Sequence, residues 1–185
     1  RAGARKARRA NGAGANGHDP APAPSNVPLS RRPPPVVVGA TGGSGTRAFQ
    51  GVLAALDVYM GARLNNAGDA LDIEPFFNRW VNKLTEAHNR IDYEWEALDP
   101  DLRARAVAAL KLRLNQYLAP CPRETRWGWK SPRSIWTLPV IEHTVPGFRF
   151  LHVVRDGRDM AFSSNINQFR KHSGALFGAP GRAAG

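Results

Sequence analysis

Glycine and hydroxyl residues are concentrated in one short segment, where they could bind an anion. Residues 39–46 read Gly-Ala-Thr-Gly-Gly-Ser-Gly-Thr and follow three consecutive valines. Glycines allow positive φ angles and a close approach of backbone N–H groups to an anion, and a helix that begins at Thr46 would add its positive end. The segment predicts a phosphate-binding loop, with a plain strand-to-helix turn as the alternative. The predicted contacts are Gly42, Gly43, Ser44, Gly45, Thr46 and Arg47.

A second group of anion-binding residues lies further along the chain. Arg155 directly follows the β-branched and aromatic run 148–154, and Ser163 lies eight residues later. A helix rises about 1.5 Å per residue, so it can bring a hydroxyl back over the end of the strand, where it meets the guanidinium at one phosphate. The simpler alternative is that Arg158 and Asp159 pair at a solvated helix start. We predict a second phosphate site at Arg155 and Ser163.

Three strand-and-helix units are expected to position these groups. The apolar patterns predict a strand at 36–38 with a helix from Thr46 to about Gly61, a strand at 126–130 with a helix over 132–144 kinked at Pro139, and a strand at 148–154 with a helix after it. Such units predict an α/β fold, a three-layer sandwich with a parallel sheet, which binds ligands at the carboxyl ends of its strands. Amphipathic helices at 75–90 and 100–118 are expected to form a cap.

Length and composition limit the classes of protein that this chain can represent. Its 185 residues suit one domain, at roughly 100 to 200 residues per domain. The single cysteine, Cys121, excludes an internal disulfide and a cysteine-based zinc site. No apolar run approaches the roughly 18 residues of a membrane span, and no secretory signal is recognisable. The sequence therefore leaves the compartment, cytoplasm or Golgi lumen, unassigned.

The formal charge of +11 is distributed unevenly along the chain. Residues 1–35 carry seven positive groups and one negative group, a net +6 against +5 for the other 150 residues. This segment has almost no large apolar side chains and predicts a disordered basic arm. Residues 36–185 form the predicted domain, which we expect to be a fragment incomplete at its C-terminus, because the chain opens with arginine and closes on small residues.

Three families of anion-binding loop compete for residues 39–46. A nucleotide triphosphatase loop needs a lysine before Thr46, where this chain has Gly45. The glycine spacing also resembles that of NAD(P)-binding short-chain dehydrogenases, but none of the three tyrosines starts the Tyr-x-x-x-Lys that those enzymes use. The third possibility is a helix opened by Ser-Gly-Thr, which resembles the 5′-phosphosulfate loop of sulfotransferases. In that family a basic residue precedes the serine; here Gly43 stands there, and Arg47 follows Thr46.

Two later segments favour the sulfotransferase resemblance. Arg155 followed by Ser163 resembles the 3′-phosphate motif of that family, and Lys130-Ser131-Pro132 resembles its Lys-Ser/Thr-Pro element. The resemblance spans about residues 36–170 and implies a fold like that of the P-loop nucleotide triphosphatases. The resemblance does not extend to the distal C-terminal portion that usually completes the nucleotide site in the family.

The resemblance also implies a reaction. A sulfuryl group would pass from 3′-phosphoadenosine 5′-phosphosulfate (PAPS) to an acceptor hydroxyl or amine, possibly on a carbohydrate, without a metal ion. Lys130 is the first choice for stabilising the leaving oxygen, since an ammonium can follow a moving charge. The catalytic base is open among Asp72, Glu74, His88 and His143, with Glu74 preferred because it precedes a helix on the expected acceptor side. An NAD(P)-binding domain and a non-enzymatic basic phosphate- or nucleic-acid-binding module remain as alternatives.

Overall fold

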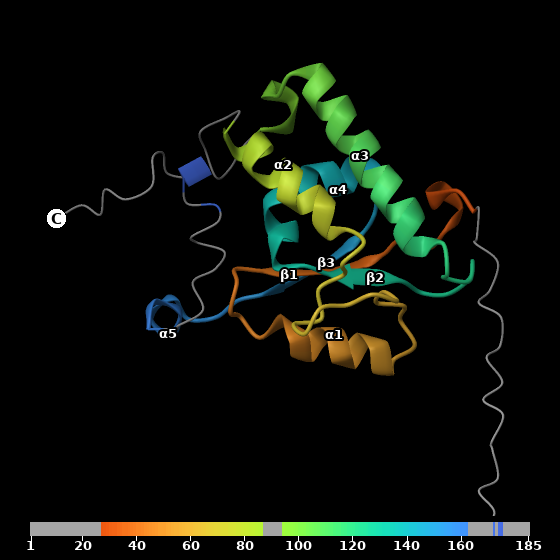
Figure 1. The fold of residues 1–185 in the computed structure, drawn as a ribbon, viewed down its shortest axis with the longest axis horizontal. Coiled ribbons are helices and arrows are strands. Elements are labelled where there is room, and N and C mark those ends of the chain that lie inside the picture. The colour runs from red at the N-terminus through yellow and green to blue at the C-terminus, as the bar shows by residue number, and fades with distance from the viewer. Residues whose placement is uncertain (1–26, 87–93, 163–171, 173, 176–185) are drawn as a thin grey trace, which may run out of the picture.

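A small parallel sheet forms the centre of the molecule (Figure 1). The computed structural model describes residues 27–86, 94–162, 172, 174 and 175. The strands β1 (Val36–Ala40), β2 (Gly128–Lys130) and β3 (Arg149–Val153) lie in the order β2-β1-β3 and are all parallel. In this register Val37 lies opposite Trp129 on one side and Phe150 on the other. The predicted parallel sheet and α/β class are confirmed.

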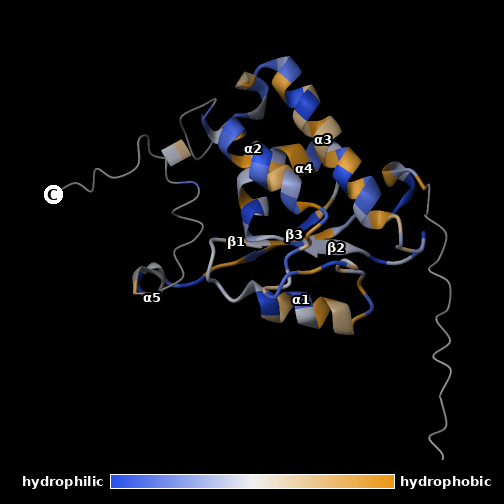
Figure 2. Cartoon of the chain, viewed as in Figure 1, coloured by the Kyte–Doolittle hydropathy of each residue, from blue (hydrophilic) through white to orange (hydrophobic). Residues whose placement is uncertain are grey.

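Helices cover both faces of the sheet, which gives three layers. In Figure 1, α1 (Thr46–Ala55) lies on one face, and α2 (Glu74–Glu86), α3 (Pro100–Leu118) and α4 (Leu138–Thr144) lie on the other. A short α5 (Gly157–Ala161) follows β3. Figure 2 shows α3 alternating between hydrophilic and hydrophobic residues, as expected for a helix with one buried face.

The two faces of β1 belong to two separate cores. Val37 packs in the larger cluster with the buried aromatic residues of α2 and the leucines of α3, whereas Val38 packs in a smaller cluster beside α1. Successive strand residues point to opposite faces, so a run of three valines is suited to a strand covered on both sides. The two helices that were expected to form a cap, α2 and α3, contribute much of this larger core and so form one layer of the domain.

The helix boundaries follow local sequence signals where those signals are strong. α3 begins after Asp99, whose Oδ1 accepts a hydrogen bond of 2.8 Å from the backbone N–H of Leu102, and Pro100 occupies its first turn. The helix predicted over 132–144 is instead a 3₁₀ helix, Pro132–Thr137, followed by α4. Pro139 lies in the first turn of α4, where backbone N–H groups make no intrahelical hydrogen bond, so its missing N–H costs nothing.

The first helix is shorter than predicted. α1 ends at Ala55, and Asp57 adopts a left-handed φ of 58°. The chain then returns beside β2, where the backbone N–H of Tyr59 donates to the Arg126 carbonyl at 2.8 Å. Met60, which continues the helical spacing in the sequence, is buried in the smaller core from this extended segment. The apolar spacing therefore continued past the end of the helix and did not mark where α1 ends.

Part of the predicted arm packs on the domain. The buried guanidinium of Arg32 donates to the carbonyls of Cys121 at 3.0 Å and Pro122 at 3.1 Å. The indole Nε1 of Trp127 donates to the Pro33 carbonyl at 2.7 Å. Contacts with the domain thus begin before residue 35, because an arginine and a proline carbonyl satisfy polar groups near the end of α3 and the start of β2.

Candidate functional site

One pocket brings together the predicted glycine loop, Lys130 and Glu74. It has a volume of about 600 Å³ and lies at the carboxyl ends of β1 and β2. Its lining residues are Gly42, Gly43, Gly45, Thr46, Arg47, Asn65, Ala67, Asp69, Glu74, Lys130, Ser131, Pro132 and Arg133. A larger pocket of about 820 Å³ is lined by Pro33–Pro35, Trp127 and Val145, which precede the strands. Parallel sheets bind ligands at their carboxyl ends, so we take the smaller pocket as the candidate site.

The glycine loop forms one wall of this pocket. Gly43 and Gly45 have φ angles of 87° and 81°, in the left-handed region that favours glycine. The Ser44 hydroxyl donates to the Thr41 carbonyl at 2.6 Å, so it shapes the loop from within. Ser44 is absent from the lining, whereas the other five predicted loop residues are present. The loop ends in α1, whose first backbone N–H groups have no intrahelical partner and can bind an anion.

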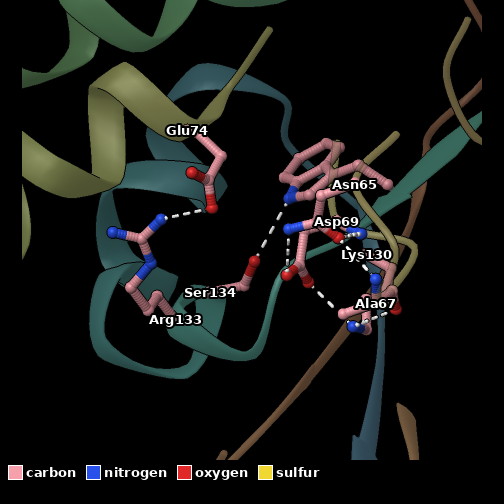
Figure 3. Close-up of polar contacts among 8 residues, drawn as sticks. Asn65, Ala67, Asp69, Glu74, Lys130, Arg133 and Ser134 are labelled. Atoms are coloured by element: carbon pink, nitrogen blue, oxygen red, sulfur yellow. Dashed lines mark hydrogen bonds and ion pairs between the residues drawn. The ribbon is translucent and has the colours of Figure 1, made fainter. Parts of the chain in front are cut away.

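Lys130 enters the pocket from the end of β2 (Figure 3). Its side chain is 3% exposed, and its ammonium donates to Asp69 Oδ1 at 2.7 Å and to the Ala67 carbonyl at 2.9 Å. An ammonium has three N–H donors, so a third donor is available to a ligand. The sequence predicted Lys130 as a site residue but not its partner, because 61 residues separate the two in the chain.

Asp69 is itself held by Asn65, within a tight turn (Figure 3). The Asn65 Oδ1 accepts hydrogen bonds of 2.9 Å from the backbone N–H groups of Ala67 and Asp69. Its Nδ2 donates to Asp69 Oδ2 at 2.9 Å. The carboxylate therefore receives donors on both oxygens and has a fixed orientation. Asn-Asn-Ala-Gly-Asp carries the sequence signal of such a turn, since asparagine side chains readily bond the backbone two residues ahead.

Glu74 and Arg133 form a second charged pair in the pocket (Figure 3). Arg133 Nη2 donates to Glu74 Oε1 at 2.7 Å, and its Nη1 donates to Asn78 Oδ1 at 2.5 Å. The Arg133 side chain is 3% exposed and lies over the ring of Phe77, whereas the Glu74 side chain is 29% exposed. The carboxylate at the start of α2 is therefore accessible from the pocket while its partner is buried.

The other candidates for the base lie elsewhere. Asp72 forms an ion pair of 2.9 Å with Arg63 and is absent from the pocket lining. The His143 ring packs against Trp95, with 4.7 Å between the ring centroids, and it lines the larger pocket. His88 lies outside the described residues. Of the candidates that the structure describes, Glu74 therefore lines the site.

Arg155 joins the end of β3 to the glycine loop. Its Nη1 donates to the Gly43 carbonyl at 3.1 Å, and its Nε lies 4.0 Å from the Asp159 carboxylate. Its proposed companion, Ser163, lies outside the described residues. Arg158 pairs with Asp156 at 2.7 Å rather than with Asp159, and these hydrogen bonds lower the pKa of the Asp156 carboxyl. Arg155 thus reaches the loop, although it is absent from the pocket lining.

Ser131 provides a test of whether the pocket suits a polar ligand. The residue is 2% exposed and lines the pocket, yet its Oγ has no hydrogen-bond partner among the described residues. A buried hydroxyl without a partner costs roughly 1–3 kcal/mol, so such groups normally meet a ligand or a water molecule. An orphaned hydroxyl beside Lys130 and a glycine loop fits a ligand rich in phosphate or sulfate oxygens.

The balance of charge in the pocket also suits an anion. Lys130 and Arg133 are each paired with a carboxylate, from Asp69 and Glu74. The Arg47 side chain is exposed and forms no hydrogen bond or ion pair with any described residue. The lining therefore has one uncompensated positive side chain, and the N–H groups of the loop lie beside it. In the described part of the chain, no three or more His, Cys, Asp or Glu side chains are grouped so that they could hold a metal ion.

Comparison with protein families assigns most of this chain to a known class of enzyme. The sequence profile of the sulfotransferase family matches residues 34–180. The chain therefore belongs to the sulfotransferase family, and its reaction class is sulfuryl transfer from a nucleotide sulfate donor to an acceptor. Comparisons with curated proteins and with solved structures gave no significant match. None of the helices in the described residues is long and apolar enough to span a membrane.

Proposed function

We propose that this chain transfers a sulfuryl group from PAPS to an acceptor hydroxyl or amine. The acceptor atom forms a bond to sulfur as the bond between sulfur and the 5′-phosphate oxygen breaks, the acceptor proton passes to a base, and adenosine 3′,5′-bisphosphate leaves. The observation that carries this proposal is the convergence of the glycine loop, Lys130 and Glu74 on one pocket. Such a reaction depends mainly on positioning and on stabilising charge at the leaving oxygen.

The proposed donor site uses the glycine loop for one end of the nucleotide and Arg155 for the other. Backbone N–H groups from Gly42 to Arg47, with the Thr46 hydroxyl, bind the 5′ side. Arg155 and Ser163 bind the 3′-phosphate. The hydrogen bond from Arg155 to the Gly43 carbonyl supports a shared nucleotide site, because it brings the guanidinium to the edge of the sheet where the loop lies. The Ser131 hydroxyl, which has no hydrogen-bond partner among the described residues, is available as a further donor to the ligand.

In this proposal Lys130 stabilises the leaving oxygen, and Asp69 positions Lys130. The ammonium is buried and bonded to Asp69 and to the Ala67 carbonyl, so two of its three N–H groups have fixed directions. A fixed direction for the third avoids reorganisation during the reaction. Asp69 acts through Lys130 and is a positioning residue.

Glu74 is the proposed base. It lies at the start of α2, lines the pocket, and is the more exposed member of its pair with Arg133. The Arg133 hydrogen bond engages Oε1, which leaves Oε2 to face an acceptor. A carboxylate held this way has one oxygen fixed by the protein and one available for a proton.

Ligand-induced stabilisation of the whole chain tests the proposed donor. Adenosine 3′,5′-bisphosphate at a hundred times its dissociation constant should stabilise the fold by about 2.7 kcal/mol, which raises the melting temperature. NADP and short DNA are titrated in the same way as comparison ligands. Stabilisation by NADP without stabilisation by the bisphosphate would establish the dehydrogenase-like alternative, and stabilisation by DNA alone would establish the nucleic-acid-binding module.

Arg155→Ala tests the 3′-phosphate site. The change should weaken the bisphosphate by about 1.5–3 kcal/mol, the range for a hydrogen bond to a charged group, and leave a 3′-dephosphorylated nucleotide unaffected. Arg158→Ala is the matched control, because that exposed arginine pairs with Asp156 on the same loop. Equal losses for both nucleotides would show that Arg155 does not contact the 3′-phosphate.

A further inference from the structure

Ser131 combines deep burial with a hydroxyl that the fold does not use. The residue is 2% exposed, and its Oγ is a buried atom without a hydrogen-bond partner among the described residues. Ser131 lines the same pocket as Lys130, the glycine loop and Glu74. A buried hydroxyl without a partner destabilises a fold, so its place at the wall of this pocket indicates a ligand that accepts its hydrogen bond.

The local structure does not use this hydroxyl in the role that serines usually have at such a position. Ser131 is the N-cap of the 3₁₀ helix Pro132–Thr137, and an N-cap serine commonly accepts a hydrogen bond from a backbone N–H two or three residues ahead. Here the N–H of Ser134 donates to the Ser131 carbonyl at 3.0 Å, and the Ser131 side chain makes no capping hydrogen bond. The hydroxyl is therefore not engaged at the start of this helix.

Ser131 lies between the two groups that the proposed reaction uses on either side of sulfur. Lys130, immediately before it, is the proposed group at the leaving oxygen. Arg133, two residues after it, forms an ion pair of 2.7 Å with Glu74, the proposed base at the acceptor. All four residues line one pocket. In an in-line transfer the sulfur lies between the leaving oxygen and the acceptor, so a donor between these two groups suits the sulfuryl oxygens.

The backbone around Ser131 is fixed by neighbouring segments. The N–H of Ser131 donates to the Val38 carbonyl in β1 at 3.1 Å, and the Lys130 carbonyl accepts from the N–H of Ala70 at 3.3 Å. The glycine loop, to which the proposed function assigns the 5′-phosphate, follows β1, whereas Ser131 follows β2. Ser131 is therefore a preorganised donor at a different strand end from the donors to the phosphate.

We propose that Ser131 donates a hydrogen bond to a non-bridging oxygen of the sulfuryl group, an inference that rests on the proposed sulfuryl transfer. Ser131 keeps its own proton throughout, while the acceptor proton passes to Glu74. Adenosine 3′,5′-bisphosphate, the product, has no sulfuryl group, so only the donor makes this contact. The hydroxyl therefore makes the site bind PAPS in preference to the product, and the cost is an unpaired buried hydroxyl when the donor is absent.

The test compares the dissociation constants of PAPS and of adenosine 3′,5′-bisphosphate for the full chain, without an acceptor. Ser131→Ala should weaken PAPS relative to the bisphosphate roughly 10- to 100-fold, the range for one hydrogen bond to a charged group. Ser134→Ala is the matched control and should leave the ratio unchanged, because Ser134 is also buried but its Oγ accepts from the indole Nε1 of Trp129 at 3.1 Å. Equal weakening of both nucleotides by Ser131→Ala, or of neither, would overturn the proposal.

The stability of the chain without ligand gives a second measurement. Ser131→Ala should raise the urea midpoint, since it removes a buried hydroxyl without a partner, whereas Ser134→Ala should lower it, since the Trp129 indole loses its acceptor. A lower midpoint for Ser131→Ala would show that the hydroxyl is bonded within the fold and would overturn the inference. If the unaltered chain binds neither nucleotide, the proposed sulfuryl transfer itself fails. If it binds both and Ser131→Ala leaves their ratio unchanged, the Ser131 contact alone fails.

Discussion

The buried pair of Lys130 and Asp69 allows a quantitative prediction. The side chains are 3% and 15% exposed, and their charged atoms lie 2.7 Å apart. Removing one partner of a buried pair typically costs 3–5 kcal/mol, because the remaining charge is left without compensation. Asp69→Ala should therefore destabilise the chain by about 3 kcal/mol, since the orphaned Lys130 is the more deeply buried partner. Lys130→Met should cost less, about 1–2 kcal/mol, because Asp69 keeps the Asn65 amide donor and some contact with solvent.

The two changes should not be additive. In the double variant no charge is left uncompensated, so its destabilisation should fall short of the sum of the single values by about 1.5 kcal/mol or more. Urea denaturation measures the unfolding free energy of each variant, provided that all variants have the same m-value. In a chain of this size, 1 kcal/mol corresponds to a shift in melting temperature of roughly 2–4 °C. Additivity within about 0.5 kcal/mol would refute the reasoning, because it would show that the two side chains do not interact.

Three further predictions concern stability. Gly128→Ala should be severely destabilising, because an added Cβ would lie 2.0 Å from the Val36 carbonyl oxygen. The Cβ added by Gly51→Ala meets nothing within 4 Å, so this change should stabilise α1 by about 1 kcal/mol. Urea midpoints compare the two variants, and equal effects would contradict the steric argument. Burial raises the pKa of Tyr59 from 10.0 to about 12. The folded state thus retains the phenol proton more strongly than the unfolded state, and stability should fall as pH rises from about 10 to 12. Tyr59→Phe should flatten this decline of the urea midpoint with pH. An unchanged slope of midpoint against pH would exclude Tyr59 as its cause. Arg32→Met should destabilise the chain by about 2 kcal/mol and speed limited proteolysis near residue 32, because the carbonyls of Cys121 and Pro122 lose charged donors. An unchanged cleavage rate would show that these hydrogen bonds do not hold the chain around residue 32 on the domain.

The sequence predicted the elements whose signals are local. Three valines predicted a strand covered on both faces, and β1 begins at Val36. Asp99 and Pro100 marked the start of α3 because a capping carboxylate and a first-turn proline are both local features. The end of α1 was missed because Met60 kept the helical spacing although the chain had turned at Asp57. Apolar spacing does not by itself distinguish the end of a helix from a returning extended segment, because Met60 is buried from the extended segment.

Prediction of the site was limited in the same way. The glycine loop and Lys130 were identifiable because each lies at the end of a strand, and the carboxyl ends of parallel strands share one edge. Asp69 was missed because its role depends on an ion pair across 61 residues of sequence. Ser131 lies in the Lys-Ser-Pro element that the sequence singled out, but its lack of a hydrogen-bond partner among the described residues is a property of the fold that the sequence could not predict.

The register of the sheet connects the fold to the proposed chemistry. Lys130 lies opposite Val38, so the ammonium enters the pocket two residues before β1 ends and the glycine loop begins. Slipping the pairing by one residue would send Lys130 to the other face of the sheet, away from Asp69. Gly128 permits the observed register because it pairs with Val36 at a distance that excludes any Cβ. Gly128, which lies outside the glycine loop, is therefore as necessary to the proposed site as the glycines within the loop. In the proposal the loop glycines supply the N–H donors for the anion, and Gly128 fixes the register that brings Lys130 beside them.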